Sequence, residues 1–162
     1  MSKETLIDEF TMSHWAAMKA IDGIEHDESL RLPEEGGNCM NWVLGHLTTT
    51  RGEILKMLGA EPIWQDESLR HYKRGAERLT DSAKAIDFDK ISSDFAGSQE
   101  PLLAALDAQT ADQLAVRIGF SFVDRDDDTL EQALAGFAFH EAYHVGQIGI
   151  LRRFLGHSGI IK

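Results

Sequence analysis

The sequence predicts an all-α protein that folds as one four-helix bundle over residues 1–162. Apolar residues recur at steps of three, four and seven along most of the chain, and no alternating strand pattern extends beyond a few residues. The length of 162 residues suits a single domain with a sizeable core. A composition of 43% hydrophobic and 27% charged residues excludes a disordered chain or a coiled-coil rod.

Two helices are predicted in the first sixty residues. The first runs over about residues 5–26, and its apolar stripe consists of Leu6, Phe10, Ala17, Ile21 and Ile24. Pro33 and the glycines that follow it interrupt the pattern, and Asn38 or Asn41 is the expected N-cap of the second helix. The second helix ends near Gly59. Its apolar stripe consists of Val43, Leu47, Thr50, Ile54 and Met57.

A long irregular stretch over about residues 60–86 follows, with one short helix expected around 68–73. A third helix is predicted over 88–106, because its apolar residues repeat at steps of three and four. Pro101 should kink it, since proline removes an intrahelical hydrogen bond. The long connection can run back along a helix, so the third helix is expected to lie parallel to the second.

The last helix has the clearest pattern. Asp128 is its expected N-cap, Glu131 the expected capping-box partner, and Gly156 its end. Its predicted buried stripe consists of Leu130, Leu134, Phe137, His144, Ile148, Leu151 and Leu155. The preceding segment, 112–128, is expected to form no sheet and to tuck its apolar side chains under the bundle; these are Val116, Ile118, Phe120 and Phe122.

The charge balance argues against two kinds of partner. Sixteen basic and 27 acidic residues give a net charge of −11, which repels nucleic-acid phosphates and anionic lipid headgroups. No apolar run is long enough to span a membrane, and no export signal is seen. The single cysteine, Cys39, suits a reducing compartment. We therefore expect a cytoplasmic protein with neither nucleic acid nor membrane as a partner.

Two of the seven histidines are spaced for metal binding. His140 and His144 are four residues apart on one helix, about 6 Å along its axis and about 40° around it, so both imidazoles can reach one ion. On that predicted buried stripe an unpartnered imidazole would lose hydration. Spacing alone leaves a metal-binding pair and a hydrogen-bonded core pair as alternatives. His46 is the candidate third ligand, or otherwise a helix-face histidine.

The segment His140–His144 also matches the HExxH motif of zinc proteases. Gln147 and Ile150 occupy the positions at which one class of these proteases needs glycine and histidine, and no acidic residue follows His144. The sequence therefore disfavours a protease. Glu141 points about 100° away from His140 along the helix and is expected to be a solvated or interfacial carboxylate.

The order of these motifs resembles the DinB-like (also called YfiT-like) group of metalloenzymes. The resemblance rests on NWVLGHL at 41–47 and HEAYHVGQI at 140–148, and it covers nearly the whole chain. It implies an up-down-down-up bundle with a long connection between helices two and three. It also implies a divalent ion, zinc or nickel, bound by His46, His140 and His144. Characterised relatives include thiol-dependent transferases and an isomerase.

Three neutral imidazoles leave coordination positions open, which is typical of catalytic sites. The expected function is metal-dependent transfer of a low-molecular-weight thiol, or hydrolysis of another small-molecule substrate. Gln147 is a candidate to bond substrate or metal-bound water, or alternatively another helix; Glu53 is a candidate to orient a ring or accept a proton. Cys39 is not expected to be a nucleophile. The alternatives are a non-catalytic, metal-stabilised stress-response module and a bundle whose histidines merely pack.

Two expectations concern the surroundings of the site. Three residues of the long connection either close over the site or pack across one end of the bundle: Tyr72, Arg74 and Trp64. A homodimer is expected, because Gly146 and Gly149 allow close helix approach and Trp15 or Met18 offers an apolar patch.

Overall fold

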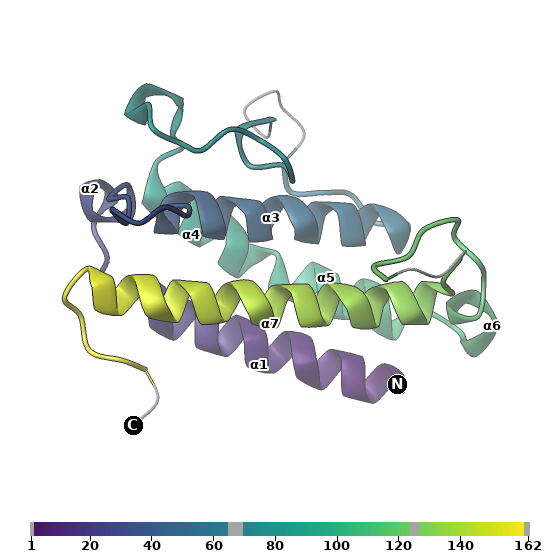
Figure 1. Cartoon of the computed structure of the whole chain (residues 1–162). Helices are drawn as coiled ribbons and strands as arrows, with labels where there is room; N and C mark the ends of the chain where they lie inside the picture. The colour runs from purple at the N-terminus through teal and green to yellow at the C-terminus, as the bar shows by residue number, and fades with distance from the viewer. Residues whose placement is uncertain (1, 65–69, 124–126, 161–162) are drawn as a thin grey trace.

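The computed structural model describes residues 2–64, 70–123 and 127–160 and is helical throughout its core (Figure 1). The bundle is built from α1 (Lys3–Ile21), α3 (Met40–Met57), α4 (Phe88–Gly97) with α5 (Gln99–Asp107), and α7 (Leu130–Phe154). The connections contain α2 (His26–Ser29), the 3-10 turn η2 (Ser82–Lys84) and α6 (Ala111–Leu114). Over the described ranges the structure has no β-strand, only an isolated bridge between Arg117 and Thr129. The all-α prediction is confirmed.

Contacts between helix ends define the directions of the helices. Arg152 near the end of α7 donates to the carbonyl of Ala20 near the end of α1, at 3.1 Å, so these two helices run the same way. Asn41 at the start of α3 donates to the carbonyl of Ile86 just before α4, at 2.9 Å. The α4–α5 segment therefore runs along α3 in the same direction, opposite to α1 and α7 (Figure 1).

Two of the predicted helices are interrupted. The first ends at Ile21, and the separate helix α2 begins at His26 behind a capping box of its own. The third divides at Ser98 into α4 and α5. Pro101 lacks the N–H that would bond to the carbonyl of Gly97, so the expected kink becomes a break one turn before the proline.

The start of α3 differs from the prediction. Cys39 occupies the N-cap position and makes no capping bond with its side chain, so neither Asn38 nor Asn41 caps the helix. Asn41 is fully buried and uses its side chain to hold the long connection against α3. The end agrees with the prediction, because Gly59 follows α3 with a φ of +78°, a conformation that glycine adopts without strain.

The start of α7 lies one residue later than predicted. Thr129 is the N-cap and forms a capping box with Gln132, whereas Asp128 and Glu131 were the expected pair. Asp128 lies outside the helix because its backbone bonds to the 118–120 segment.

Five of the seven residues in the predicted stripe of α7 are buried, and Phe137 and His144 are the two exceptions. The central residues of the buried face are Leu134, Ala138, Glu141, Val145 and Ile148. Phe137, His140 and His144 are only partly buried and lie at the edge of this face. The two exceptions arise because α7 has two apolar faces, one toward the core and one toward a cavity described below.

Of the two long connections, the later one differs from expectation. The helix expected around 68–73 falls partly on residues 65–69, which lie outside the described residues. In the later connection, Val116 and Phe120 remain 55% and 39% exposed instead of tucking under the bundle. No helix within the described ranges has the length and apolar character needed to cross a membrane.

The apolar core consists of two clusters, one toward each end of the bundle. Their boundary falls at one level of the bundle, between residues 10 and 17 on α1, 47 and 54 on α3, 95 and 102 on α4–α5, and 138 and 145 on α7. The polar residues of interest lie at this level; they are His14, His46, Arg51, Ser98, His140, Glu141 and His144. We call this level the polar layer.

Candidate metal centre

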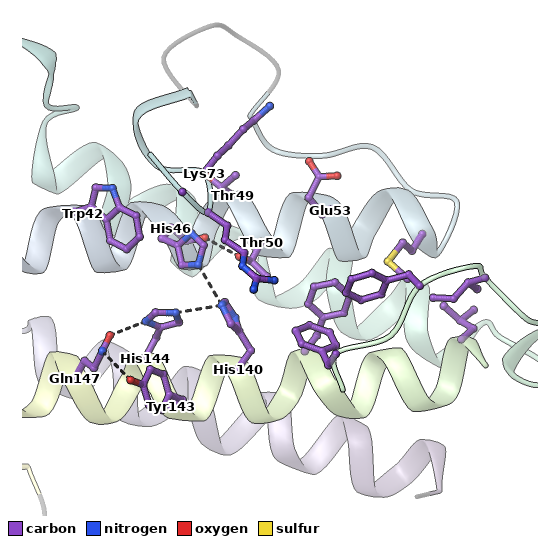
Figure 2. A pocket seen from close by; sticks show the side chains of 18 of the residues that line it. Trp42, His46, Thr49, Thr50, Glu53, Lys73, His140, Tyr143, His144 and Gln147 are labelled. Carbon is purple, nitrogen blue, oxygen red and sulfur yellow. Dashed lines mark hydrogen bonds between the residues drawn. The ribbon is translucent and has the colours of Figure 1, made fainter. Parts of the chain in front are cut away.

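Three histidines from two helices converge in the polar layer (Figure 2). Nε2 of His140 lies 3.1 Å from Nε2 of His46 and 3.1 Å from Nε2 of His144. One ring nitrogen from each of the three lies within 4.8 Å of the others. His46 on α3 is buried, and the two α7 histidines are partly buried. The structure thus brings together the three residues that the sequence singled out.

The ring of His46 is fixed by the long connection. Its Nδ1 lies 2.8 Å from the carbonyl oxygen of Tyr72, which only accepts hydrogen bonds. Nδ1 therefore carries the hydrogen, and Nε2 presents a lone pair toward the other histidines. Trp42 stacks on the same ring at 4.9 Å between centroids, and its indole N–H donates to the carbonyl of His71 at 2.7 Å.

Tyr72 holds its carbonyl in place because its side chain is anchored against α3. The ring packs directly against Gly45, and a Cβ at that position would overlap the ring carbons. The hydroxyl donates to Oδ1 of Asn41 and accepts from the backbone N–H of Ile86, both at 2.8 Å. Burial raises the pKa of Tyr72 to about 12, so the hydroxyl remains a donor. Gly45 is therefore part of the support of the site.

His144 is held from its own helix. Its Nδ1 lies 2.7 Å from Oε1 of Gln147, and the amide nitrogen of Gln147 donates to the hydroxyl of Tyr143 at 3.4 Å (Figure 2). The amide oxygen accepts the N–H of His144, which leaves a lone pair on Nε2. Gln147 therefore bonds a candidate ligand, and this contact is neither of the two roles weighed for it from the sequence.

These residues fit a bound cation. His46 and His144 both present lone pairs at Nε2, and a single N–H on His140 could satisfy only one of them. No described group donates a hydrogen bond to Nδ1 of His140. Nothing therefore holds this ring in the tautomer that carries its hydrogen on Nε2. Two nitrogens bound to zinc at about 2.0–2.1 Å with tetrahedral angles are about 3.3 Å apart, close to the observed separation. A divalent ion would accept all three lone pairs.

The three histidines are poised in the neutral form that binds metals. Burial, with the charge of neighbouring histidines, lowers the pKa of His140 to about 4. Burial also lowers the pKa of His46 and of His144 below the ordinary value. Neutral imidazoles suit zinc and nickel.

A buried ion pair lies beside this centre and corrects the prediction for Glu141. Glu141 is 2% exposed and accepts two hydrogen bonds from the guanidinium of Arg51, at 2.8 and 2.7 Å. Arg51 is fully buried, donates to the hydroxyl of Ser98 at 2.9 Å, and stacks over the ring of Phe95 at 4.1 Å. The pair joins α3 to α7 one residue after His140, and it thereby fixes the separation of the helices that carry the ligands.

Arg51 was missed by the sequence reasoning, although a signal was present. It stands four residues after Leu47 and three before Ile54, on the apolar stripe of its helix. A charge on a buried stripe requires a buried partner of opposite charge. Glu141 lies on the matching stripe of α7, between Ala138 and Val145.

The remaining candidates are distributed around the site. Glu53 is exposed on α3 and forms an ion pair with Lys56 at 3.2 Å, while the carbonyl of Tyr72 orients His46 instead. Trp64 and Tyr72 are both buried, and the indole N–H of Trp64 donates to Asp94. Both side chains therefore pack into the bundle, which is the second of the two roles considered for them. Arg74 lines the cavity at the histidines.

A cavity of about 1230 Å³ opens beside the three histidines. It runs between α3 and α7, and the long connection and the segment 116–122 complete its walls. Polar residues surround the histidines at one end, and the other end is lined mainly by aromatic and aliphatic residues, with Glu53, Gln109 and Gln113 among them. The cavity can admit a small molecule to the point at which the three nitrogens converge.

Fold and site together define a helical bundle with a three-histidine centre open to a cavity. The chain belongs to the DinB superfamily, whose family model matches residues 9–148. Among solved structures it is similar to a conserved protein from Enterococcus faecalis, with a TM-score of 0.73, 15% identity, and coverage of 96% of this chain and 97% of that one. It is also similar to YfiT from Bacillus subtilis, described as a probable metal-dependent hydrolase with an unusual four-helix bundle topology; here the TM-score is 0.71, the identity 20%, and the coverage 98% of this chain and 91% of that one. A search of curated proteins gives no match.

Proposed function

We propose that this protein is a metal-dependent enzyme that acts on a small molecule. His46, His140 and His144 hold one divalent ion, zinc or nickel, and the reaction is hydrolysis or the transfer of a low-molecular-weight thiol. The observation that carries the proposal is the convergence of three Nε2 atoms with their Nδ1 hydrogens directed elsewhere on two of the rings. The description of YfiT as a probable metal-dependent hydrolase supports the hydrolytic version.

A divalent ion held by three imidazoles supplies Lewis acidity and lowers the pKa of a water or thiol that it binds. The chain contributes the orientation of the ligands, because Tyr72 and Gln147 accept the N–H groups of His46 and His144. Glu53 lines the cavity two turns after His46 and is the only carboxylate among its described lining residues. We assign Glu53 as the acceptor of the proton released by the attacking group, and Gln147 as a positioning residue.

The test is the metal content of purified, untagged protein. We expect close to one divalent ion per chain in the native protein and little in His140→Ala, with His157→Ala as the control because His157 lies outside the centre and pairs with Glu28. Equal metal in the native protein and His140→Ala would contradict the proposal. A panel of esters, amides and thiols with electrophilic acceptors then separates enzyme from binding module, since turnover should disappear in His46→Ala.

We further propose a cytoplasmic homodimer. Trp15 is 53% exposed, whereas Met18 is partly buried against the core, so Trp15 is the better candidate for an apolar contact. On α7, three exposed apolar side chains share one face with Gly146; they are Phe139, Tyr143 and Ile150. The buried thiol of Cys39 is compatible with a reducing compartment. Light scattering that gives the single-chain mass of 18.0 kDa at micromolar concentration would contradict the dimer.

A further inference from the structure

The cavity beside the histidines is far larger than an ion and a reacting water require. A water occupies about 30 Å³ of liquid volume, and small-molecule sites usually enclose about 300–1,000 Å³. The cavity here has about 1230 Å³, and its two ends differ in chemistry. A ligand that fills it must therefore have two chemically different parts.

The end away from His144 is aromatic. Phe122 packs edge-to-face on Phe137 at 4.7 Å between centroids and lies 6.3 Å from the ring of His140, so the apolar wall begins at a candidate ligand. Phe120 stacks on Phe137 at 6.2 Å. The Phe122 ring sits directly on Gly136 of α7, where a Cβ would overlap it. The absence of a side chain at 136 therefore shapes this wall.

Helix geometry gives the length of the apolar end. On α7 the lining extends from His140 back to Leu130, ten residues or about 15 Å at the usual rise per residue. On α3 it extends from His46 to Met57, eleven residues or about 16 Å. The two helices agree, so a ligand body of about 15 Å fits between the histidines and the far end.

The end at the histidines is cationic. Lys73 and Arg74 line the cavity from the long connection, and within the described ranges neither side chain has an ion-pair or hydrogen-bond partner. Figure 2 shows the Lys73 side chain directed away from the three histidines, which leaves Arg74 as the cation at this end. Arg74 follows Tyr72 by two residues, and the carbonyl of Tyr72 lies 2.8 Å from Nδ1 of His46, so Arg74 enters the cavity wall at the histidine end. Glu53, the opposing charge on the wall, is paired with Lys56.

This local charge is opposite to that of the whole chain, which has a net charge of −11. An unpaired arginine on the cavity wall of an acidic protein favours a negatively charged ligand group there. The aromatic side chains of the far end favour burial of an uncharged body, and the one carboxylate in the described lining, Glu53, is paired with Lys56.

We infer that the substrate is an organic anion with an apolar body of about 15 Å or less, whose anionic group is bound by Arg74 beside the histidines and whose body lies against Phe120, Phe122 and Phe137. That this ligand is the substrate rests on the proposed function. The anionic-group contact and the apolar contact are properties of the chain and hold without a metal.

The test uses two fluorescent probes on metal-free, chelator-treated protein. Anilinonaphthalene sulfonate is an aromatic anion, and phenylnaphthylamine has the same aromatic body without the charge. Arg74→Gln should weaken binding of the sulfonate about fivefold, the effect of one unit charge at contact distance in water, and leave the neutral probe within about twofold. Lys84→Gln is the matched control, because it removes the same charge outside the cavity wall and should change neither probe.

Gly136→Ala tests the apolar end and should weaken both probes by a similar factor. Phe120→Ser serves the same purpose if circular dichroism shows that Gly136→Ala is unfolded. The inference is overturned if the native protein binds neither probe, if Arg74→Gln affects both probes equally or has no more effect than Lys84→Gln, or if a folded apolar-end variant binds both probes as the native protein does. A native protein that shows the expected probe pattern yet retains no metal would contradict the proposed function alone.

Discussion

Helices α3 and α7 carry two polar clusters within one layer of the bundle, and the clusters differ in how their polar atoms are satisfied. In the ion-pair cluster, all three nitrogens of the Arg51 guanidinium have partners within the chain, provided by Glu141, Ser98 and His14. In the histidine cluster, three Nε2 atoms face one another, and Nδ1 of His140 has no described partner.

The difference separates a structural role from a binding role. A buried polar group whose partners all belong to the chain is satisfied by the fold itself, and loss of one partner leaves the other buried and unpaired. The histidine lone pairs converge without enough hydrogen-bond donors in the chain, so they require a bound cation or another external ligand. The histidine cluster opens to the cavity, through which such a ligand can enter. Variants of the two clusters should therefore affect different measurements.

The largest expected effect is on the free energy of unfolding, through the ion-pair cluster. Arg51→Met leaves the Glu141 carboxylate buried without its partner and should lower the free energy of unfolding by about 3–5 kcal/mol. The double variant Arg51→Met with Glu141→Leu removes both charges and should recover most of that loss. Urea unfolding of metal-free protein measures both. A double variant as unstable as Arg51→Met would contradict this account of the cluster.

A smaller effect is expected on metal affinity, through the residues that support the histidine cluster. Gly45→Ala forces the Tyr72 ring away from α3 and shifts the carbonyl that orients His46, which should weaken zinc or nickel binding by about 10–100-fold. Gly146→Ala is the control, because a Cβ there meets no other atom. Competition with a chromogenic chelator gives the affinities. Equal affinities of the two variants would show that the carbonyl is dispensable.

The smallest effect is on the pH dependence of stability. Burial, and then the charge of Arg51, lowers the pKa of His14 to about 4. Unfolding restores the ordinary pKa near 6.5, so the unfolded chain binds more protons and stability falls as pH drops from about 6.5 toward about 4. In metal-free protein, His14→Asn should reduce the loss of unfolding free energy between about pH 6.5 and 4. The share of that loss that comes from His140 should remain. An identical slope in both proteins, measured by urea unfolding at several pH values, would rule out His14 as a contributor.

The sequence predicts the helical class and the His140–His144 pair because both depend on periodicity within single helices, whereas the third histidine, His46, joins them through the resemblance to the DinB-like family. It does not predict the partner of His46, since the acceptor is a backbone carbonyl and any residue at position 72 offers one. It misplaces Glu141, because α7 buries one apolar face in the core and turns another toward the cavity, and spacing alone does not say which face is which. The N-caps of α3 and α7 differ from the predicted residues because Asn41 and Asp128 already make tertiary hydrogen bonds.

The hydrogen bond from His46 to the carbonyl of Tyr72 links two equilibria that are usually treated separately. If the docked position of the connection raises the affinity of the histidines for an ion, then the ion must stabilise that docked position by the same factor, because the coupling free energy is reciprocal. Protease cleavage near residues 73–78 should accordingly slow as metal is added, in proportion to the ion's preference for the docked form. The connection thus becomes a reporter of metal occupancy that can be read on a gel.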